Sequence, residues 1–293
     1  MGVLLLLWPP VISGCTPRGY LDSLLVGHHF ELTQGLSYGN EARQRLDVYR
    51  PKRQQQAAPV IVFLYGGRWQ HGSRKEYRLL GDAVTRHGLV AVVPDYRLYP
   101  DVRFPAWVRD AALAVRWVRD SVRQFGGDPA RIIVVGHSAG GHTSALLALD
   151  GRYLRQAGVP GSVVRGFVSL AGPVATVWTD ADVQALMGPH EGWSATYPLE
   201  QVDGKAPPLL LLQGGRDGTV SPNDAVRLTG RIRERGGCAR AIVYKGLGHV
   251  GIAVALVLDR FNIAPVMEDV LRFVGSPTAF TCGAAGINRT PGR

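Results

Sequence analysis

Cysteine is scarce in this chain, which has only Cys15, Cys238 and Cys282 among its 293 residues. The spacing of these residues matches none of the patterns of zinc sites, so we expect no structural metal. If Cys15 is modified, Cys238 and Cys282 remain as a pair that an oxidising compartment would allow to bond. The sequence does not decide whether they do.

Long runs of basic residues are also missing, although the chain is basic overall. It has 33 Lys and Arg against 23 Asp and Glu, a formal charge of +10 and a sequence pI near 9.9. The cations are scattered, without the basic runs or the interleaved aromatic residues that are typical of nucleic-acid binding. We interpret them as a solvated basic surface and expect no nucleic-acid partner. The sequence does not indicate an oligomeric state.

The apolar stretch at the beginning of the chain is too short to cross a bilayer as a helix. It starts at Val3, is interrupted by Pro9-Pro10 and ends at Ile12-Ser13-Gly14-Cys15. This pattern resembles a secretory signal followed by a bacterial lipoprotein cleavage box, in which Cys15 becomes the lipid-bearing first residue. We expect a signal segment over 1–15, a tether over 16–35 and attachment to a bacterial membrane, facing the periplasm or the exterior. The alternative is a cytoplasmic protein with a frayed N-terminus.

The central part of the chain, residues 36–275, alternates short apolar runs with helical patterns. At 293 residues and 46% hydrophobic content, the chain is long enough for one domain with a full core. The predicted strands lie within 60–65, 89–93, 132–135, 164–170, 209–212 and 241–244, and the predicted helices within 77–87, 107–125, 145–149, 223–235 and 266–274. This alternation predicts an α/β fold with a mostly parallel sheet and helices on both faces. Residues 36–49, with a turn at Gly39-Asn40, predict an antiparallel hairpin at one edge.

Two segments depart from this rhythm. Residues 174–205 have no strong period and are rich in large side chains, so we expect a small cap over the carboxyl ends of the strands. From Ser276 onward the sequence is rich in Gly, Pro and Thr, and we expect residues 276–293 to be a disordered tail.

The most informative motif is Gly136-His137-Ser138-Ala139-Gly140, a Gly-x-Ser-x-Gly sequence. It follows a β-branched run and precedes a helical pattern of small residues, which is the order of a nucleophile elbow. The glycines allow the close approach of strand and helix that such a turn requires. Ser138 is therefore the predicted nucleophile.

A serine hydroxyl needs a base to remove its proton. Seven of the eight histidines occur before the fifth predicted strand, whereas His249 follows the sixth in a glycine-rich turn. Asp217 follows the fifth strand and would orient the base. Asp95 precedes Ser138 in the chain, and we expect it to hold a loop through a carboxylate–arginine pair. Ser138, Asp217 and His249 have the chain order of α/β-hydrolase triads.

An acyl-transfer site also needs backbone donors for the developing oxyanion. We assign these to the N–H groups of Gly67, Arg68 and Ala139. We expect four large side chains to form the substrate pocket: Trp69, His137, Trp178 and Trp193.

With these residues in place, the chain resembles an α/β-hydrolase of the esterase/lipase group, related to hormone-sensitive lipase and bacterial carboxylesterases. The resemblance covers about residues 36–275 and rests on Tyr65–Trp69, Pro94–Arg97, Gly126–Pro129, the elbow, Asp217 and His249. The first of these loops usually reads His-Gly-Gly-Gly in the family, whereas here Tyr65 replaces the His and Arg68 the third Gly. Similar departures occur in relatives of prenylcysteine methylesterase and kynurenine formamidase.

The resemblance implies a serine hydrolase that acts on small or aromatic carboxylic esters without a metal or organic cofactor. An arylformamidase or a small peptidase remains open within the same fold. An inactive hydrolase-fold binding protein is the alternative from another class. The physiological substrate does not follow from the sequence.

Overall fold

The computed structural model describes residues 27, 29–54, 56–282 and 288–289. Cys15 and the expected signal segment lie outside these residues. Within them, nine strands form one sheet in the order β1-β2-β4-β3-β5-β6-β7-β8-β9. The strands are β1 (Phe30–Ser37), β2 (Arg45–Pro51), β3 (Ala58–Leu64), β4 (Val90–Pro94), β5 (Gly127–His137), β6 (Val164–Leu170), β7 (Leu209–Gly214), β8 (Ala239–Tyr244) and β9 (Asn288–Arg289).

The sheet is parallel from β4 and β3 through β9, and β2 runs antiparallel to both β1 and β4. The mostly parallel sheet and the antiparallel edge hairpin are therefore confirmed. Strands β3, β4, β6 and β7 are almost entirely buried and rich in Val, Ile and Leu, because helices cover both of their faces. Strand β5 is buried from Ile132 to Gly136.

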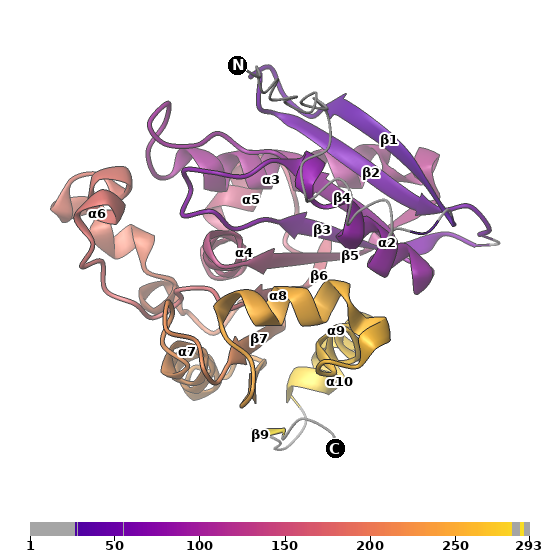
Figure 1. Cartoon of the computed structure of the whole chain (residues 1–293). Helices are drawn as coiled ribbons and strands as arrows, with labels where there is room; N and C mark the ends of the chain where they lie inside the picture. Colours follow the sequence, from indigo (N-terminus) through magenta and orange to yellow (C-terminus); the bar gives the residue numbers. More distant parts are fainter. Residues whose placement is uncertain (1–26, 28, 55, 283–287, 290–293) are drawn as a thin grey trace, which may run out of the picture.

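Helices lie on the two faces of the sheet, with α8 and α9 in front and α3 and α5 behind in the view of Figure 1. The α-helices are α2 (Arg78–Arg86), α3 (Ala106–Ser121), α4 (Ala139–Leu149), α5 (Arg152–Gln156), α6 (Ala181–Met187), α7 (Asn223–Glu234), α8 (His249–Val257), α9 (Val266–Gly275) and α10 (Pro277–Cys282). Short 3-10 helices are η1 (Arg74–Glu76), η2 (Val122–Phe125), η3 (His190–Thr196), η4 (Pro198–Gln201) and η5 (Asp259–Phe261). The sequence predicted neither α5 nor α8.

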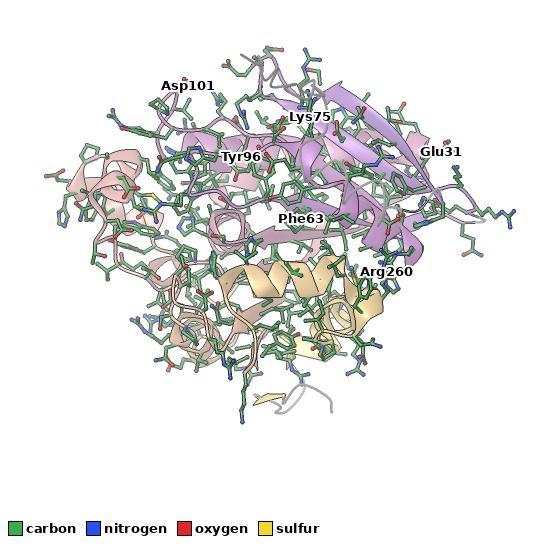
Figure 2. All side chains as sticks on the ribbon, viewed as in Figure 1. Glu31, Phe63, Lys75, Tyr96, Asp101 and Arg260 are labelled. Carbon is green, nitrogen blue, oxygen red and sulfur yellow. A yellow bond between two sulfur atoms is a disulfide. The ribbon has the colours of Figure 1, made fainter. Side chains whose placement is uncertain are left out.

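The core fills the space between the sheet and these helices. In Figure 2, Phe63 of β3 and Tyr96 lie inside the molecule among packed side chains, whereas Glu31 of β1 lies at its edge. Amphipathic α3 buries one face, including Trp107, Ala111 and Val115. Arg109, Arg116 and Asp120 lie on its exposed face. The core thus supports the carboxyl ends of the central strands rigidly.

Two expected boundaries differ from the structure. Strand β1 begins at Phe30, which is buried and paired with Pro51 of β2, so residues 30–35 belong to the sheet and not to a tether. The expected disordered tail begins with helix α10, which a disulfide joins from Cys282 to Cys238, the residue before β8. Composition did not reveal this helix, because the bond that fixes it joins residues 44 positions apart.

The segment expected to form the cap contains α6, η3 and η4 between β6 and β7. In Figure 1, α6 stands away from the sheet at one side of the molecule. Trp178 at the start of this segment is buried and donates a hydrogen bond from Nε1 to Oγ1 of Thr196. The segment is thus folded against itself.

Candidate active site

Ser138 occupies the sharp turn between β5 and α4. Its φ of 54° and ψ of −119° lie outside the regions that side-chain-bearing residues favour. A Cβ on Gly136 would lie 2.0 Å from the carbonyl oxygen of Gly140, and one on Gly140 would lie 2.0 Å from that of Leu64. The two glycines of the motif are therefore required by the close approach of backbone segments, as expected for a nucleophile elbow.

The structure brings Ser138, His249 and Asp217 together, although they come from three separate strand ends. Nε2 of His249 lies 2.8 Å from Oγ of Ser138, and Nδ1 lies 2.8 Å from Oδ2 of Asp217. Because an ionised carboxylate only accepts hydrogen bonds, Nδ1 carries the proton and Nε2 is free to accept from the serine. This is the arrangement of a nucleophile, a base and an orienting acid.

Asp217 is held by its own turn. Its Oδ1 accepts hydrogen bonds from the backbone N–H of Thr219 at 2.8 Å and of Val220 at 2.9 Å. The side-chain amide of Gln213, the residue before the end of β7, donates to Oδ2 at 2.8 Å. These donors stabilise the charged carboxylate and fix its direction toward His249.

His249 is the first residue of α8, which follows Gly248. The sequence predicted a glycine-rich turn at this position and missed the helix. Gly214 allows the turn to approach β7, because a Cβ there would lie 2.5 Å from the carbonyl oxygen of Leu247. The start of the helix therefore sets the position of the imidazole.

The loop after β3 has an unusual backbone. Gly67, Arg68 and Trp69 have consecutive positive φ angles of 117°, 54° and 58°. The carbonyl oxygen of Gly67 accepts hydrogen bonds from the N–H groups of Gln70 and His71. Among the backbone hydrogen bonds of turns, loops and caps in the described residues, none has the N–H of Gly67 or Arg68 as donor. These groups and the N–H of Ala139 at the start of α4 remain available to a ligand.

Tyr65, which replaces the usual histidine of this loop, fixes its start through hydrogen bonds to Asp95 and Tyr96. Its hydroxyl donates to Oδ1 of Asp95 at 2.8 Å, and its carbonyl accepts from the hydroxyl of Tyr96 at 2.6 Å. Arg74 pairs with Asp95 and donates its backbone N–H to Oδ1 at 2.7 Å. Burial and the neighbouring Asp95 raise the pKa of Tyr65, so its hydroxyl stays protonated and remains a donor. Asp95 thus holds the loop through an arginine pair, but its partner is Arg74, whereas Arg97 of the predicted Pro94–Arg97 motif pairs with Asp110.

A cavity of about 180 Å³ opens beside Ser138. Of the four predicted pocket residues, Trp69 and Trp178 line it. Residues of the cap, the two motif loops and the turn of Asp217 complete the lining: Arg68, Ser138, Ala139, Pro173, Thr176, Val177, Thr179, Asp180, Val183, Thr219 and Val220. The sequence predicted the cap from the lack of periodicity over 174–205, and this pattern did not identify which of its residues line the cavity.

The other two predicted pocket residues lie elsewhere. His137 packs its ring 5.2 Å from that of His249 and bonds through Nε2 to the carbonyl oxygen of His249 at 3.0 Å. Burial lowers the pKa of His137 to about 4, so it is a neutral support for the turn of His249. Trp193 donates from Nε1 to the carbonyl of Gly188 and packs against His190 within the cap. Residue size alone did not distinguish these roles.

Asp224 is a further residue at the site, and it ties the cavity wall to α7. This buried carboxylate accepts hydrogen bonds from the N–H of Ala175 and the hydroxyl of Thr176.

In the part of the chain that the structure describes, no three His, Cys, Asp or Glu side chains are grouped to hold a metal ion. No helix there is long and apolar enough to cross a membrane.

Comparison with protein-family models matches residues 46–232 to the BD-FAE family. Esterase LipC of Mycobacterium tuberculosis is 34% identical over 248 residues, which cover 77% of this chain and 58% of LipC. Isoprenylcysteine alpha-carbonyl methylesterase ICME of Arabidopsis thaliana is 26% identical over 245 residues, which cover 76% of this chain and 57% of the relative. The chain thus spans little more than half the length of these relatives.

Solved structures show the same fold. A truncated carbohydrate esterase from gut microbiota superposes with a TM-score of 0.74 at 22% identity, over 87% of this chain and 99% of that one. A hyperthermophilic esterase from the archaeon Pyrobaculum calidifontis superposes with a TM-score of 0.65 at 26% identity, over 86% of each chain. These likenesses confirm the α/β-hydrolase fold that the sequence predicted.

Proposed function

Because the chain belongs to the BD-FAE family of α/β-hydrolases, we propose that it hydrolyses carboxylic esters through Ser138, His249 and Asp217. The observation that carries the proposal is the continuous line of hydrogen bonds from Asp217 through His249 to Ser138, with 2.8 Å at each step. The names of LipC, an esterase, and ICME, a methylesterase, support ester over amide substrates.

The reaction proceeds in two halves. Oγ of Ser138 attacks the ester carbonyl while Nε2 of His249 takes its proton, and collapse of the tetrahedral intermediate transfers that proton to the leaving alcohol. Water then attacks the acyl-enzyme, giving a proton to Nε2, and the carboxylic acid leaves as Ser138 regains its hydrogen. Asp217 remains ionised throughout and stabilises the imidazolium.

The oxyanion of each intermediate would bind the backbone N–H groups of Gly67, Arg68 and Ala139. The left-handed backbone of the first two residues supports this assignment, because their N–H groups are free of the loop's own hydrogen bonds. Such donors stabilise the transition state more than the planar ester and are worth on the order of 10²–10³-fold in kcat each.

The substrates that fit best are esters with small or aromatic acyl groups. The cavity beside Ser138, at about 180 Å³, is smaller than the roughly 300–1,000 Å³ of sites for drug-sized ligands. Trp69 and Trp178 give it an apolar wall. Activity should therefore fall from butyrate to long-chain esters.

The decisive experiment measures hydrolysis of p-nitrophenyl acetate by the wild type and by Ser138→Ala, with Ser221→Ala as a control at an exposed serine. Turnover and labelling by a fluorophosphonate probe should disappear only in Ser138→Ala. Equal turnover in all three proteins would refute the proposal, and an unlabelled, inactive wild type would indicate a binding protein. N-formylkynurenine and a dipeptide amide, assayed in parallel, would identify an arylformamidase or a peptidase.

We further propose that the enzyme is exported and lipid-anchored through Cys15. The support within the described residues is the Cys238–Cys282 disulfide, because such bonds persist in oxidising compartments. Expression in a bacterial host should give a processed wild type in the membrane fraction and a soluble Cys15→Ser variant. Identical, uncleaved soluble proteins would contradict the anchor and favour a cytoplasmic enzyme.

A further inference from the structure

The side chain of Arg68 crosses from the loop after β3 to the cap. Its Nη2 lies 2.8 Å from Oδ2 and 3.0 Å from Oδ1 of Asp182, and 3.1 Å from Oδ2 of Asp180. Arg68 and Asp180 both line the cavity that contains Ser138. We call Arg68, Asp180 and Asp182 the cap clamp: Arg68 and Asp180 form part of the cavity wall, and Asp182 binds the guanidinium of Arg68.

The clamp joins the loop after β3 to the cap, which are also in contact through two buried tryptophan rings. Trp69, the residue after Arg68, is buried and meets the ring of Trp178 edge-on, with centroids 5.9 Å apart. This contact fixes the base of the loop against the start of the cap. The clamp lies outward of it, where side-chain exposure is 46% for Arg68 and 60% and 54% for Asp180 and Asp182.

The exposure of the three side chains to solvent determines the strength of the ion pairs in the clamp. Ion pairs at this exposure are worth little and are weakened by salt, so the clamp opens more readily than the tryptophan contact behind it. The hydrogen bonds from Arg68 nevertheless lower the pKa of Asp182, so both partners stay charged at neutral pH. The cavity wall thus combines a fixed apolar part with a polar part that can be displaced.

We propose that Arg68 determines acyl-chain length, because its ion pairs with Asp180 and Asp182 close the cap-side wall of the cavity. The inference rests on the proposed esterase function and adds a specificity role for a residue whose backbone N–H also faces the oxyanion. A short acyl group fits beneath the closed clamp. A longer one has to displace the clamp and loses the free energy of its ion pairs.

The test compares p-nitrophenyl butyrate with the octanoate and laurate, below their micelle concentrations. Arg68→Gly retains the backbone N–H and suits a φ of 54°, so it removes the side chain without straining the loop. The Asp180→Asn/Asp182→Asn double variant removes the partners and leaves Arg68. Both should raise kcat/KM for laurate relative to butyrate by about two- to fivefold, mainly through KM, the size of effect that exposed ion pairs give.

Two further measurements vary the salt concentration and the charge at position 68. Raising NaCl from about 0.05 to about 1 M should shift the wild-type profile toward laurate and leave that of Arg68→Gly unchanged. Arg68→Lys should keep most of the butyrate preference, and Glu268→Gln, which breaks the exposed Arg272–Glu268 pair on α9, should keep all of it.

An unaltered chain-length profile in both clamp variants would overturn the inference while leaving the esterase function intact. A shift in Arg68→Gly alone would also overturn it, because the ion pairs would then not be the cause. Loss of turnover on every ester in Arg68→Gly would assign Arg68 to the chemistry and not to selection. Failure of the esterase proposal has a separate sign, the absence of turnover and of fluorophosphonate labelling in the wild type.

Discussion

The carbonyl oxygen of Thr196 in the cap accepts a hydrogen bond from Nε2 of His142 at 2.8 Å, so the cap rests on the helix that begins beside Ser138. His142 is fully buried, and its ring packs against those of Trp69 and Trp178. Nδ1 has no hydrogen-bond partner within the described residues. The contact therefore requires a proton on Nε2, and burial keeps the imidazole neutral.

This buried imidazole predicts a loss of stability in mild acid. Burial lowers the pKa of His142 to about 4, whereas an unfolded histidine has a pKa of about 6.5. Between these pH values the unfolded chain binds a proton that the folded chain does not, so the free energy of unfolding falls as the pH falls. The full shift corresponds to about 3 kcal/mol, and His137, whose pKa is lowered similarly, acts in the same direction.

Urea unfolding at a series of pH values between about 4 and about 6.5 measures this slope. His142→Gln retains a side-chain donor for Thr196 and does not titrate, so its free energy of unfolding should depend less steeply on pH than that of the wild type. Parallel curves for the two proteins would show that His142 titrates normally in the folded state.

The second prediction concerns Asp217→Asn. The amide oxygen can replace Oδ1 as acceptor for Thr219 and Val220, so the turn should persist. Its NH₂ would then face Nδ1 of His249 and disfavour the required tautomer, and kcat for p-nitrophenyl acetate should fall on the order of 10⁴-fold. The control is Asp259→Asn, because Asp259 also bonds a histidine, His87 at 2.6 Å, but lies outside the site. A similar loss of kcat in both variants would show that Asp217 has no specific role in catalysis.

The third prediction separates glycines by their surroundings. Gly140→Ala would place a methyl group 2.0 Å from the carbonyl oxygen of Leu64, so the elbow must shift and both activity and stability should drop. Gly230→Ala in α7 meets nothing within 4 Å and should stabilise the protein by up to about 1 kcal/mol. Thermal unfolding and esterase assays of the two variants provide the comparison. A fully active, stable Gly140→Ala protein would be incompatible with this elbow.

The fourth prediction concerns the disulfide. Its two cysteines are 44 positions apart, and in the chain-entropy model such a crosslink stabilises the folded state by about 4 kcal/mol. Cys238→Ser should lower the urea midpoint by a corresponding amount, whereas reduction with a thiol should affect only the wild type. A midpoint that is insensitive to both changes would mean that the crosslink contributes nothing to stability.

The sequence predicted the strands, the hairpin and the elbow because their signals are local. Ser138 stands in a five-residue motif between a strand and a helix, and the glycines around it are explained by contacts with neighbouring strands. The approach of His249 and Asp217 to Ser138 followed from their positions at strand ends, and their roles in catalysis stay predictions. The fold and the family are confirmed by the comparisons.

The rest depended on tertiary contacts that no local pattern records. Trp178 and Trp193 look alike in the sequence, but one lines the cavity and the other caps a turn at Gly188. The clamp between Arg68 and two aspartates of the cap spans 112 and 114 positions. Helix α8 begins among glycines, which disfavour helices, so its apolar residues did not reveal it.

The wide separation of the site residues has a consequence for synthesis. Ser138 lies 111 positions before His249, and the strands that carry Asp217 and His249 are added to the sheet after β5 and β6. A ribosome therefore synthesises the serine turn well before it reaches His249, the residue that we propose as the base. A chain that terminates between these two residues has the proposed nucleophile without its base, and we expect no ester hydrolysis from it.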